Sequence, residues 1–123
     1  MLKYMLDTNI VIYTMKNKPS EVKEAFKLNY GHLCISSITL MELIYGAEKS
    51  LTPEKNLHIL EGFAARLEVL SFDDKAAHHT GQLRAELAIS GMPIDPYDYM
   101  IAGHARSQGL ILVTNNMKEF GRV

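Results

Sequence analysis

Short apolar runs that alternate with longer helical stretches are the feature that most limits how this chain can fold. The runs lie at Tyr4–Leu6, Leu33–Ile35, Leu67–Leu70 and Leu110–Val113. Strands that are apolar on both sides suit a parallel sheet covered by helices. The chain therefore predicts an α/β fold, with a parallel β-sheet flanked by α-helices on both faces. In open sheets of this kind, ligands bind at the carboxyl ends of the strands.

Helix-start and helix-stop residues fill the segments between these runs. Ser37, Asp73 or Asp74, and Asp95 are typical helix caps, and Pro53 and Pro96 suit a first helical turn. We expect helices over 10–15, from 20, from 37, from 53, from 73 or 74 to 91, from 95 to 107, and a short one near Asn116. A length of 123 residues predicts one domain over residues 1–123.

Charge and cysteine content restrict the class of protein. The formal net charge is -1, which gives the whole protein no attraction to nucleic acid, although a local basic patch is sufficient for binding. Cys34 is the single cysteine, so no intramolecular disulfide forms, and its apolar neighbours predict a buried thiol in a reducing compartment. No apolar run approaches the roughly 18 residues of a membrane span. We expect a cytoplasmic protein with no membrane segment and no signal peptide.

Polar side chains lie just after the predicted strands or in the first turns of predicted helices. In chain order they are Asp7, Glu42, Asp98, Thr114, Asn116 and Glu119. In a parallel sheet they meet at one edge, where several carboxylates repel one another and raise their pKa values. A hard divalent cation such as Mg²⁺ removes that repulsion, and a bound cation activates water and polarises a phosphoryl oxygen. The pattern predicts a metal-dependent site that cleaves phosphodiesters.

Each of these residues also has a simpler interpretation. Asp7 is well placed to cap the next helix, and Asp95 followed by Asp98 resembles a capping box. Glu42 is compatible with an ordinary polar helix face, Glu119 with a solvated residue and Asn116 with a turn. The five histidines show no metal-binding spacing, and we expect them to be structural or on the surface.

Four blocks of sequence resemble a known family. MLDTN, SSITLMELIYGAEKS, PYDYMIAGHA and VTNNMKEF resemble, in this order and over nearly the whole chain, the VapC-type PIN-domain toxins. These are the ribonucleases of bacterial VapBC toxin–antitoxin pairs, and the enteric bacterial members are the most similar. The resemblance implies a PIN fold and endoribonuclease activity that depends on Mg²⁺ or Mn²⁺.

The resemblance also implies roles for individual residues. Asp7, Glu42 and Asp98 match the catalytic acids, with Asp7 and Asp98 as the principal metal ligands and Glu42 assisting either as a ligand or through water. Asn116 stands where many relatives carry Asp, so Glu119 is the candidate for a fourth catalytic carboxylate. The residues in positions of polar support are Thr8, Asn9, Thr114 and Asn116. The implied products carry a 3′ hydroxyl and a 5′ phosphate.

Partners follow from the same resemblance. It implies a VapB-type antitoxin, a toxin homodimer that uses the apolar faces of helices over 20–29 and 38–49, and tRNA as substrate, with initiator tRNA typical of the enteric members. The candidate RNA-binding cations are Lys16, Lys18, Lys49, Arg84, Arg106 and Lys118. Two departures stand out: Asp95 stands where close relatives often carry Gly, and, if the sequence is complete at Val123, the C-terminal edge strand of relatives is missing.

Other functions fit the sequence less well. A phosphatase of the haloacid dehalogenase type has a second aspartate two residues after the first, where this chain has Asn9. The acidic pair and late lysine of a receiver domain and a Gly-rich phosphate loop are not evident. A binding module that has lost catalysis stays open, because Asn116, Asp95 and the short C-terminus favour it. Metal binding distinguishes it from a nuclease.

Overall fold

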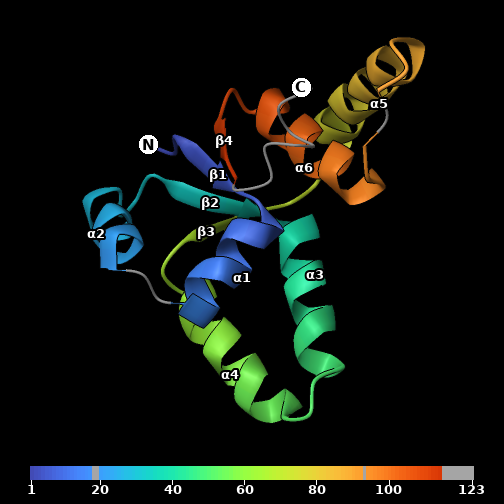
Figure 1. The fold of residues 1–123 in the computed structure, drawn as a ribbon. Coiled ribbons are helices and arrows are strands. Elements are labelled where there is room, and N and C mark those ends of the chain that lie inside the picture. Colours follow the sequence, from blue (N-terminus) through green and yellow to red (C-terminus); the bar gives the residue numbers. More distant parts are fainter. Residues whose placement is uncertain (18–19, 93, 115–123) are drawn as a thin grey trace.

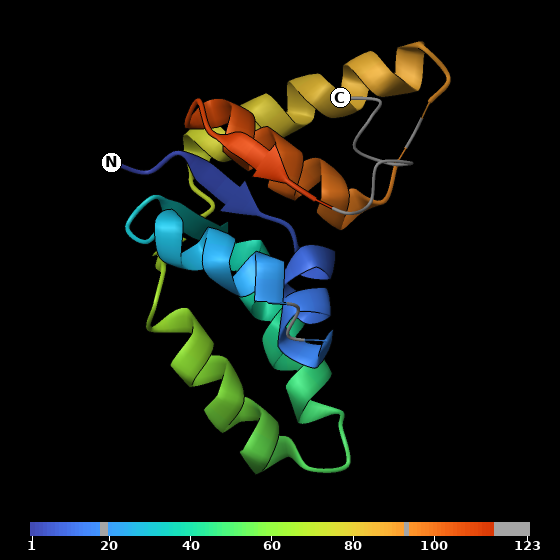
Figure 2. The same ribbon diagram turned by 60° about the vertical axis from the view of Figure 1, so that its left-hand side comes forward.

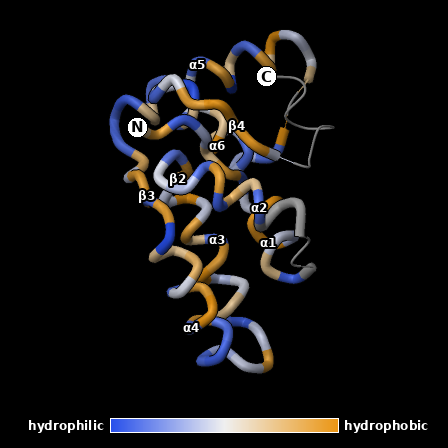
Figure 3. Tube along the Cα trace, turned by 90° about the vertical axis from the view of Figure 1, so that its left-hand side faces the viewer, coloured by the Kyte–Doolittle hydropathy of each residue, from blue (hydrophilic) through white to orange (hydrophobic). Residues whose placement is uncertain are grey.

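A four-stranded parallel sheet forms the centre of the computed structural model, which describes residues 1–17, 20–92 and 94–114 (Figure 1). The strands are β1 (Tyr4–Leu6), β2 (Leu33–Ser36), β3 (Glu68–Leu70) and β4 (Ile111–Val113), in the order β3-β2-β1-β4. All neighbouring strands pair in parallel. Figure 3 shows β4 as continuously hydrophobic. The sheet predicted from the apolar runs is confirmed.

Helices cover both faces of this sheet (Figures 1 and 2). One face carries α1 (Thr8–Asn17), α2 (Ser20–Leu28), α3 (Ser37–Glu48) and α4 (Pro53–Ala64). The other carries α5 (Asp74–Ile89) and α6 (Pro96–Ser107), with α6 against the strands and α5 against α6. In the described ranges, no helix is both long enough and apolar enough to cross a membrane.

Alternation along the strands explains why both faces are covered. Leu6 and Ile35 lie in the core formed with α1, α3 and α4. Met5 and Cys34, one residue earlier on the same two strands, lie in the core under α6. Cys34 is fully buried, as predicted, and burial together with the nearby charge of Glu68 raises the pKa of its thiol to about 11. Because neither face of the central strands meets water, an apolar side chain is favoured at every position.

The helix starts confirm some expected caps and correct others. Asp73, not Asp74, caps α5 and accepts a hydrogen bond from the Ala76 N–H at 2.9 Å. Ser36, not Ser37, caps α3, because Ser36 keeps extended backbone and its hydroxyl accepts the Ile38 N–H at 3.1 Å. The Ser37 hydroxyl instead accepts the N–H of Phe72, at 3.0 Å. The helix expected near Asn116 lies outside the described residues.

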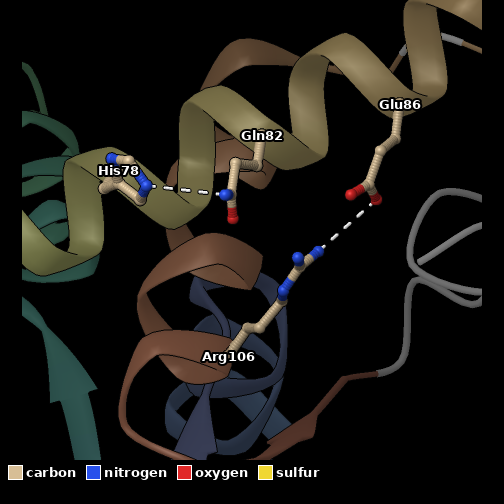
Figure 4. A network of polar contacts seen from close by, with 4 residues as sticks. All are labelled: His78, Gln82, Glu86 and Arg106. Atoms are coloured by element: carbon tan, nitrogen blue, oxygen red, sulfur yellow. Dashed lines mark hydrogen bonds and ion pairs between the residues drawn. The ribbon is translucent and has the colours of Figure 1, made fainter.

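A close contact between α5 and α6 fixes the position of α6. A Cβ atom added at Gly103 of α6 would lie 2.2 Å from Thr80 Oγ1 and 2.6 Å from Thr80 Cα. Only glycine permits this approach, since real Cβ atoms do not come so near to backbone. At the solvent side of the same helix pair, Arg106 of α6 forms an ion pair with Glu86 of α5 at 3.5 Å (Figure 4). The helix that carries Asp98, α6, is therefore held closely against α5.

Candidate active site

A polar pocket of about 340 Å³ lies where the end of β1 meets the starts of α1 and α6 and the first turns of α3. Seven residues line it: Asp7, Thr8, Asn9, Glu42, Asp95, Tyr97 and Asp98. These residues come from three distant parts of the chain. The sequence predicted that the acids after β1, in α3 and in α6 meet at one edge of the sheet. The structure places them together in this pocket, as predicted.

Asp7 is the least exposed residue of the pocket, at 1% of its surface. Its Oδ1 accepts a hydrogen bond from the Ile10 N–H at 2.8 Å, so it caps α1 and the helix starts at Thr8 rather than at Ile10. Its Oδ2 accepts a hydrogen bond from the Thr114 hydroxyl at the end of β4. Burial raises the pKa of Asp7, and the hydrogen bonds from Thr114 and Ile10 oppose that rise. The predicted direction of the shift is confirmed, but its cause is burial rather than repulsion between carboxylates.

Glu42 is positioned from the first turn of α1. The Thr8 hydroxyl donates a hydrogen bond to Glu42 Oε1 at 2.6 Å. The same Thr8 oxygen lies 3.4 Å from the hydroxyl of Thr39, which is fully buried one turn before Glu42 on α3. Sequence reasoning missed Thr39. The signal for it was its spacing, since residues i and i+3 share a helix face.

His104 connects α6, which carries Asp98, to the start of α3. It is fully buried on α6, and its Nδ1 lies 2.8 Å from the hydroxyl of Ser36, the residue that caps α3. Burial lowers the pKa of His104, against an opposing effect of the Asp73 charge. A neutral imidazole therefore links α6 to the start of α3. This confirms the expectation of a structural histidine.

The N-terminus of α6 forms the open side of the pocket. Asp95 caps this helix, and its Oδ1 accepts a hydrogen bond from the Tyr97 N–H at 2.9 Å. Asp95 and Tyr97 are exposed, whereas Asp98 is half-buried in the first helical turn. Tyr97 was not among the predicted site residues. Nothing in the sequence around Tyr97 signals that it lines a pocket with four carboxylates.

The whole described chain matches known proteins. The family model for the PIN domain matches residues 4–123. This chain belongs to the PIN-domain family. It is 67% identical to the tRNA(fMet)-specific endonuclease VapC of Shigella flexneri and 66% identical to that of Salmonella typhimurium, over all of this chain and 93% of each relative. It is thus a PIN domain of the VapC type.

Solved structures agree with this assignment. The crystal structure of DNA-bound VapBC from Salmonella typhimurium matches with a TM-score of 0.98 and 66% identity, over 100% of this chain and 93% of that one. VapBC2 from Rickettsia felis, bound to a DNA fragment from its promoter, matches with a TM-score of 0.94 and 40% identity, over 99% and 93% of the two chains. The fold predicted from the resemblance is confirmed.

Of the basic residues proposed for RNA binding, those that the structure describes do not line the pocket of this PIN domain. Four of them are described, and all four are exposed outside its lining: Lys16, Lys49, Arg84 and Arg106. The Lys49 ammonium lies 4.7 Å from the centre of the Tyr45 ring, and Arg106 pairs with Glu86. Lys18, Lys118, Asn116 and Glu119 lie outside the described residues.

The donor atoms of the pocket suit a hard divalent cation. Its acidic side chains offer only oxygen donors, which Mg²⁺ and Mn²⁺ prefer over nitrogen and sulfur. Within residues 1–17, 20–92 and 94–114, no group of three or more His, Cys, Asp or Glu side chains forms a ready-made metal site. Mg²⁺ needs no such group, because one or two carboxylates and several waters usually hold it. The residues of the pocket therefore fit a cation held by two carboxylates.

Proposed function

We propose that this protein is a metal-dependent endoribonuclease, the toxin of a VapBC toxin–antitoxin pair, and that it cleaves tRNA and so inhibits translation. The observation that carries the proposal is the meeting of Asp7, Glu42 and Asp98 in one pocket. The chain is also 67% identical to a relative named tRNA(fMet)-specific endonuclease VapC, which supports initiator tRNA as the substrate. Such a substrate belongs to the cytoplasm, as does a protein whose single cysteine is a buried thiol.

The proposed roles follow from burial and hydrogen bonding. Asp7 and Asp98 would hold Mg²⁺ or Mn²⁺, which supplies charge stabilisation and a water of lowered pKa. Asp7 is fixed for this role by hydrogen bonds from Ile10 and Thr114. Glu42, oriented by the Thr8 hydroxyl, would accept the proton of the attacking water. Asn9 and Thr114 give polar support, and we retain Asn116 and Glu119 as candidates for the same edge of the sheet.

A second groove supports the proposed antitoxin. It has a volume of about 640 Å³ between α1, α2 and α4, and most of its lining is apolar, including Phe26, Ile59 and Phe63. An amphipathic helix or an extended apolar segment binds such a groove. The matching structures from Salmonella typhimurium and Rickettsia felis are VapBC complexes, which supports a VapB-type partner. The exposed Met41, Ile44 and Tyr45 of α3 are candidates for the contact in a toxin homodimer.

The test is cleavage of tRNA by the purified protein. Total tRNA is incubated with Mg²⁺, Mn²⁺ or EDTA, and the wild type is compared with Asp7→Asn, Asp98→Asn and the matched control Asp74→Asn, an exposed residue of α5. We expect discrete cuts with either cation, cuts retained in Asp74→Asn, and loss of at least about 100-fold in the two pocket variants. Mapping of the cut ends then identifies the tRNA.

The opposite result is equally informative. A folded wild type that leaves all tRNA intact, together with calorimetry that detects no binding of Mn²⁺, would contradict the nuclease and favour a binding module that has lost catalysis. Cleavage that survives in Asp7→Asn and Asp98→Asn would instead show that another site, or a contaminating enzyme, is responsible.

A further inference from the structure

The pocket is acidic, whereas RNA carries negatively charged phosphates that an acidic surface repels. Four of its seven lining residues are carboxylates: Asp7, Glu42, Asp95 and Asp98. In the described part of the chain, no Lys or Arg lines the pocket. A phosphate group is therefore repelled at this surface except where a cation neutralises it. An uncharged part of the nucleotide, its base, suffers no such repulsion.

Tyr97 is the aromatic side chain of this lining. It is 44% exposed, and it lies in the first turn of α6 between Asp95 and Asp98. Its backbone is fixed, because its N–H donates a hydrogen bond to Asp95 Oδ1 at 2.9 Å. The ring is thus carried on a rigid helix start beside the carboxylates that act in the proposed reaction.

Tyr99, the next tyrosine of α6, has a structural role and serves as a comparison. Tyr99 is 4% exposed, and its hydroxyl accepts a hydrogen bond from the Ile94 N–H at 3.0 Å. It packs with Leu83 and Leu87 of α5 in the core between the two helices. Burial and hydrogen bonding explain Tyr99 completely. Neither burial nor hydrogen bonding explains why the Tyr97 side chain is exposed at the pocket.

We propose that Tyr97 forms a stacking subsite for the nucleobase next to the scissile phosphate. Bases stack on exposed aromatic rings in single-stranded RNA recognition, and every base has a face that can do so. Stacking on Tyr97 holds a neighbouring nucleotide without placing a second phosphate against the carboxylates. The subsite rests on the proposed ribonuclease function, and it acts in binding rather than in chemistry.

The test removes the ring and the base separately. Tyr97→Leu and Tyr97→Phe are compared with Tyr13→Leu, a matched control because Tyr13 is 42% exposed on α1 and does not line the pocket. The substrates are one short RNA that spans the mapped cut and two versions with an abasic nucleotide on the 5′ or the 3′ side of it. The readouts are KM and kcat, and thermal melting shows that each variant is folded.

We expect Tyr97→Leu to raise KM by about 5- to 150-fold, the range of base–aromatic stacking, with little change in kcat. Tyr97→Phe keeps the ring and should behave as the wild type, as should Tyr13→Leu. One abasic RNA should raise the KM of the wild type by a similar factor and should have no further effect on Tyr97→Leu. An abasic penalty of the same size in both proteins, or an unchanged KM in Tyr97→Leu, overturns the subsite.

A binding measurement separates this failure from failure of the nuclease. The same RNAs are titrated against Asp7→Asn and Asp7→Asn/Tyr97→Leu by fluorescence anisotropy, which needs no cleavage. If the wild type cuts no RNA, there is no cut to map, and a short single-stranded RNA with an abasic nucleotide at each position in turn replaces these substrates. If the ring and the base then still depend on each other for affinity, the subsite stands and the nuclease is wrong. If affinity shows no such dependence, the subsite is wrong whatever the enzyme does.

Discussion

The two walls of the acidic pocket are built in opposite ways. The inner wall is made of Asp7, Thr8 and Glu42, which are buried or half-buried. The Thr8 hydroxyl donates a hydrogen bond to Glu42, and its oxygen also lies 3.4 Å from the hydroxyl of buried Thr39. The outer wall is made of Asp95, Tyr97 and Asp98 at the start of α6, where Asp95 and Tyr97 are exposed and Asp98 is half-buried. The inner wall holds a carboxylate in an environment that disfavours its charge, whereas the outer wall leaves room for a substrate. The predictions below test this division.

Asp7→Asn gives the largest expected effect, and it should change activity and stability in opposite directions. Activity should fall at least about 100-fold. The metal-free variant should nevertheless be more stable than the wild type at pH 7, by on the order of 1 kcal/mol or roughly 4 °C in Tm. Asn keeps an acceptor for the Ile10 N–H and removes the buried charge.

The pH dependence of that difference follows from the raised pKa of Asp7. A raised pKa means that the folded protein binds the proton more readily than the unfolded chain does, so this group stabilises the fold below pH 3.8 and the effect is lost as the pH rises through the folded pKa. The advantage of Asp7→Asn should therefore shrink as the pH falls from 7 towards 4. Thermal melts in EDTA measure it, and a variant less stable than the wild type at pH 7 would contradict the burial argument.

Gly103→Ala should displace the outer wall as a whole. The added methyl group would meet the Thr80 backbone, so α6 has to move away from α5. We expect a loss of about 1–3 kcal/mol in the free energy of unfolding, measured by urea denaturation, and weaker cleavage. Gly81→Ala on α5 is the control, because nothing lies within 4 Å of its added Cβ. It should stabilise the protein by about 0.5–1 kcal/mol, and equal losses in both variants would contradict the close approach.

Thr8→Val tests the hydrogen bond inside the inner wall. Without the hydroxyl, Glu42 loses its donor, and kcat should fall about 10- to 100-fold, the usual effect of removing a group that orients an active-site ligand. Thr8→Ser should restore most of the rate. Thr14→Val on the same helix is the control, since its hydroxyl donates only to the Ile10 carbonyl at 2.7 Å. An equal fall in kcat for the control would show that the effect comes from general destabilisation.

Asp95→Asn should give the smallest effect and the opposite sign. Asn still caps α6, while one negative charge leaves the open side of the pocket. We expect KM for tRNA to fall about 2- to 5-fold at low salt and the gain to disappear at high salt, where exposed charges are screened. Asp74→Asn, which lies outside the pocket, should leave KM unchanged. A KM that rises in Asp95→Asn would mean that the Asp95 charge helps to bind the substrate.

Much of the fold could be predicted from local sequence. The strands β1, β2 and β4 follow from short runs that are apolar at every position, and the ends of α5 and α6 follow from Gly91 and Gly109, which have φ values of 73° and 66°. The convergence of Asp7, Glu42 and Asp98 was expected from a parallel sheet, with Asp7 directly after β1, Glu42 one turn into α3 and Asp98 in the first turn of α6. These features depend on neighbours in the chain or on one topological rule.

The details of the site depended on the tertiary structure. The sequence predicted Ser37 as the cap of α3, whereas Ser36 caps it and contacts His104, 68 residues away. Glu42 takes its hydrogen bond from Thr8, 34 residues earlier. The packing of α6 against α5 buries Tyr99, whereas Tyr97 stays exposed at the pocket. The sequence by itself determined which segments form strands and helices and which acids lie at the strand ends, because those are short-range matters of hydrophobic period and capping. Only the packed structure decided which oxygen each group contacts and which ring faces the pocket, because those depend on atoms brought together from distant parts of the chain.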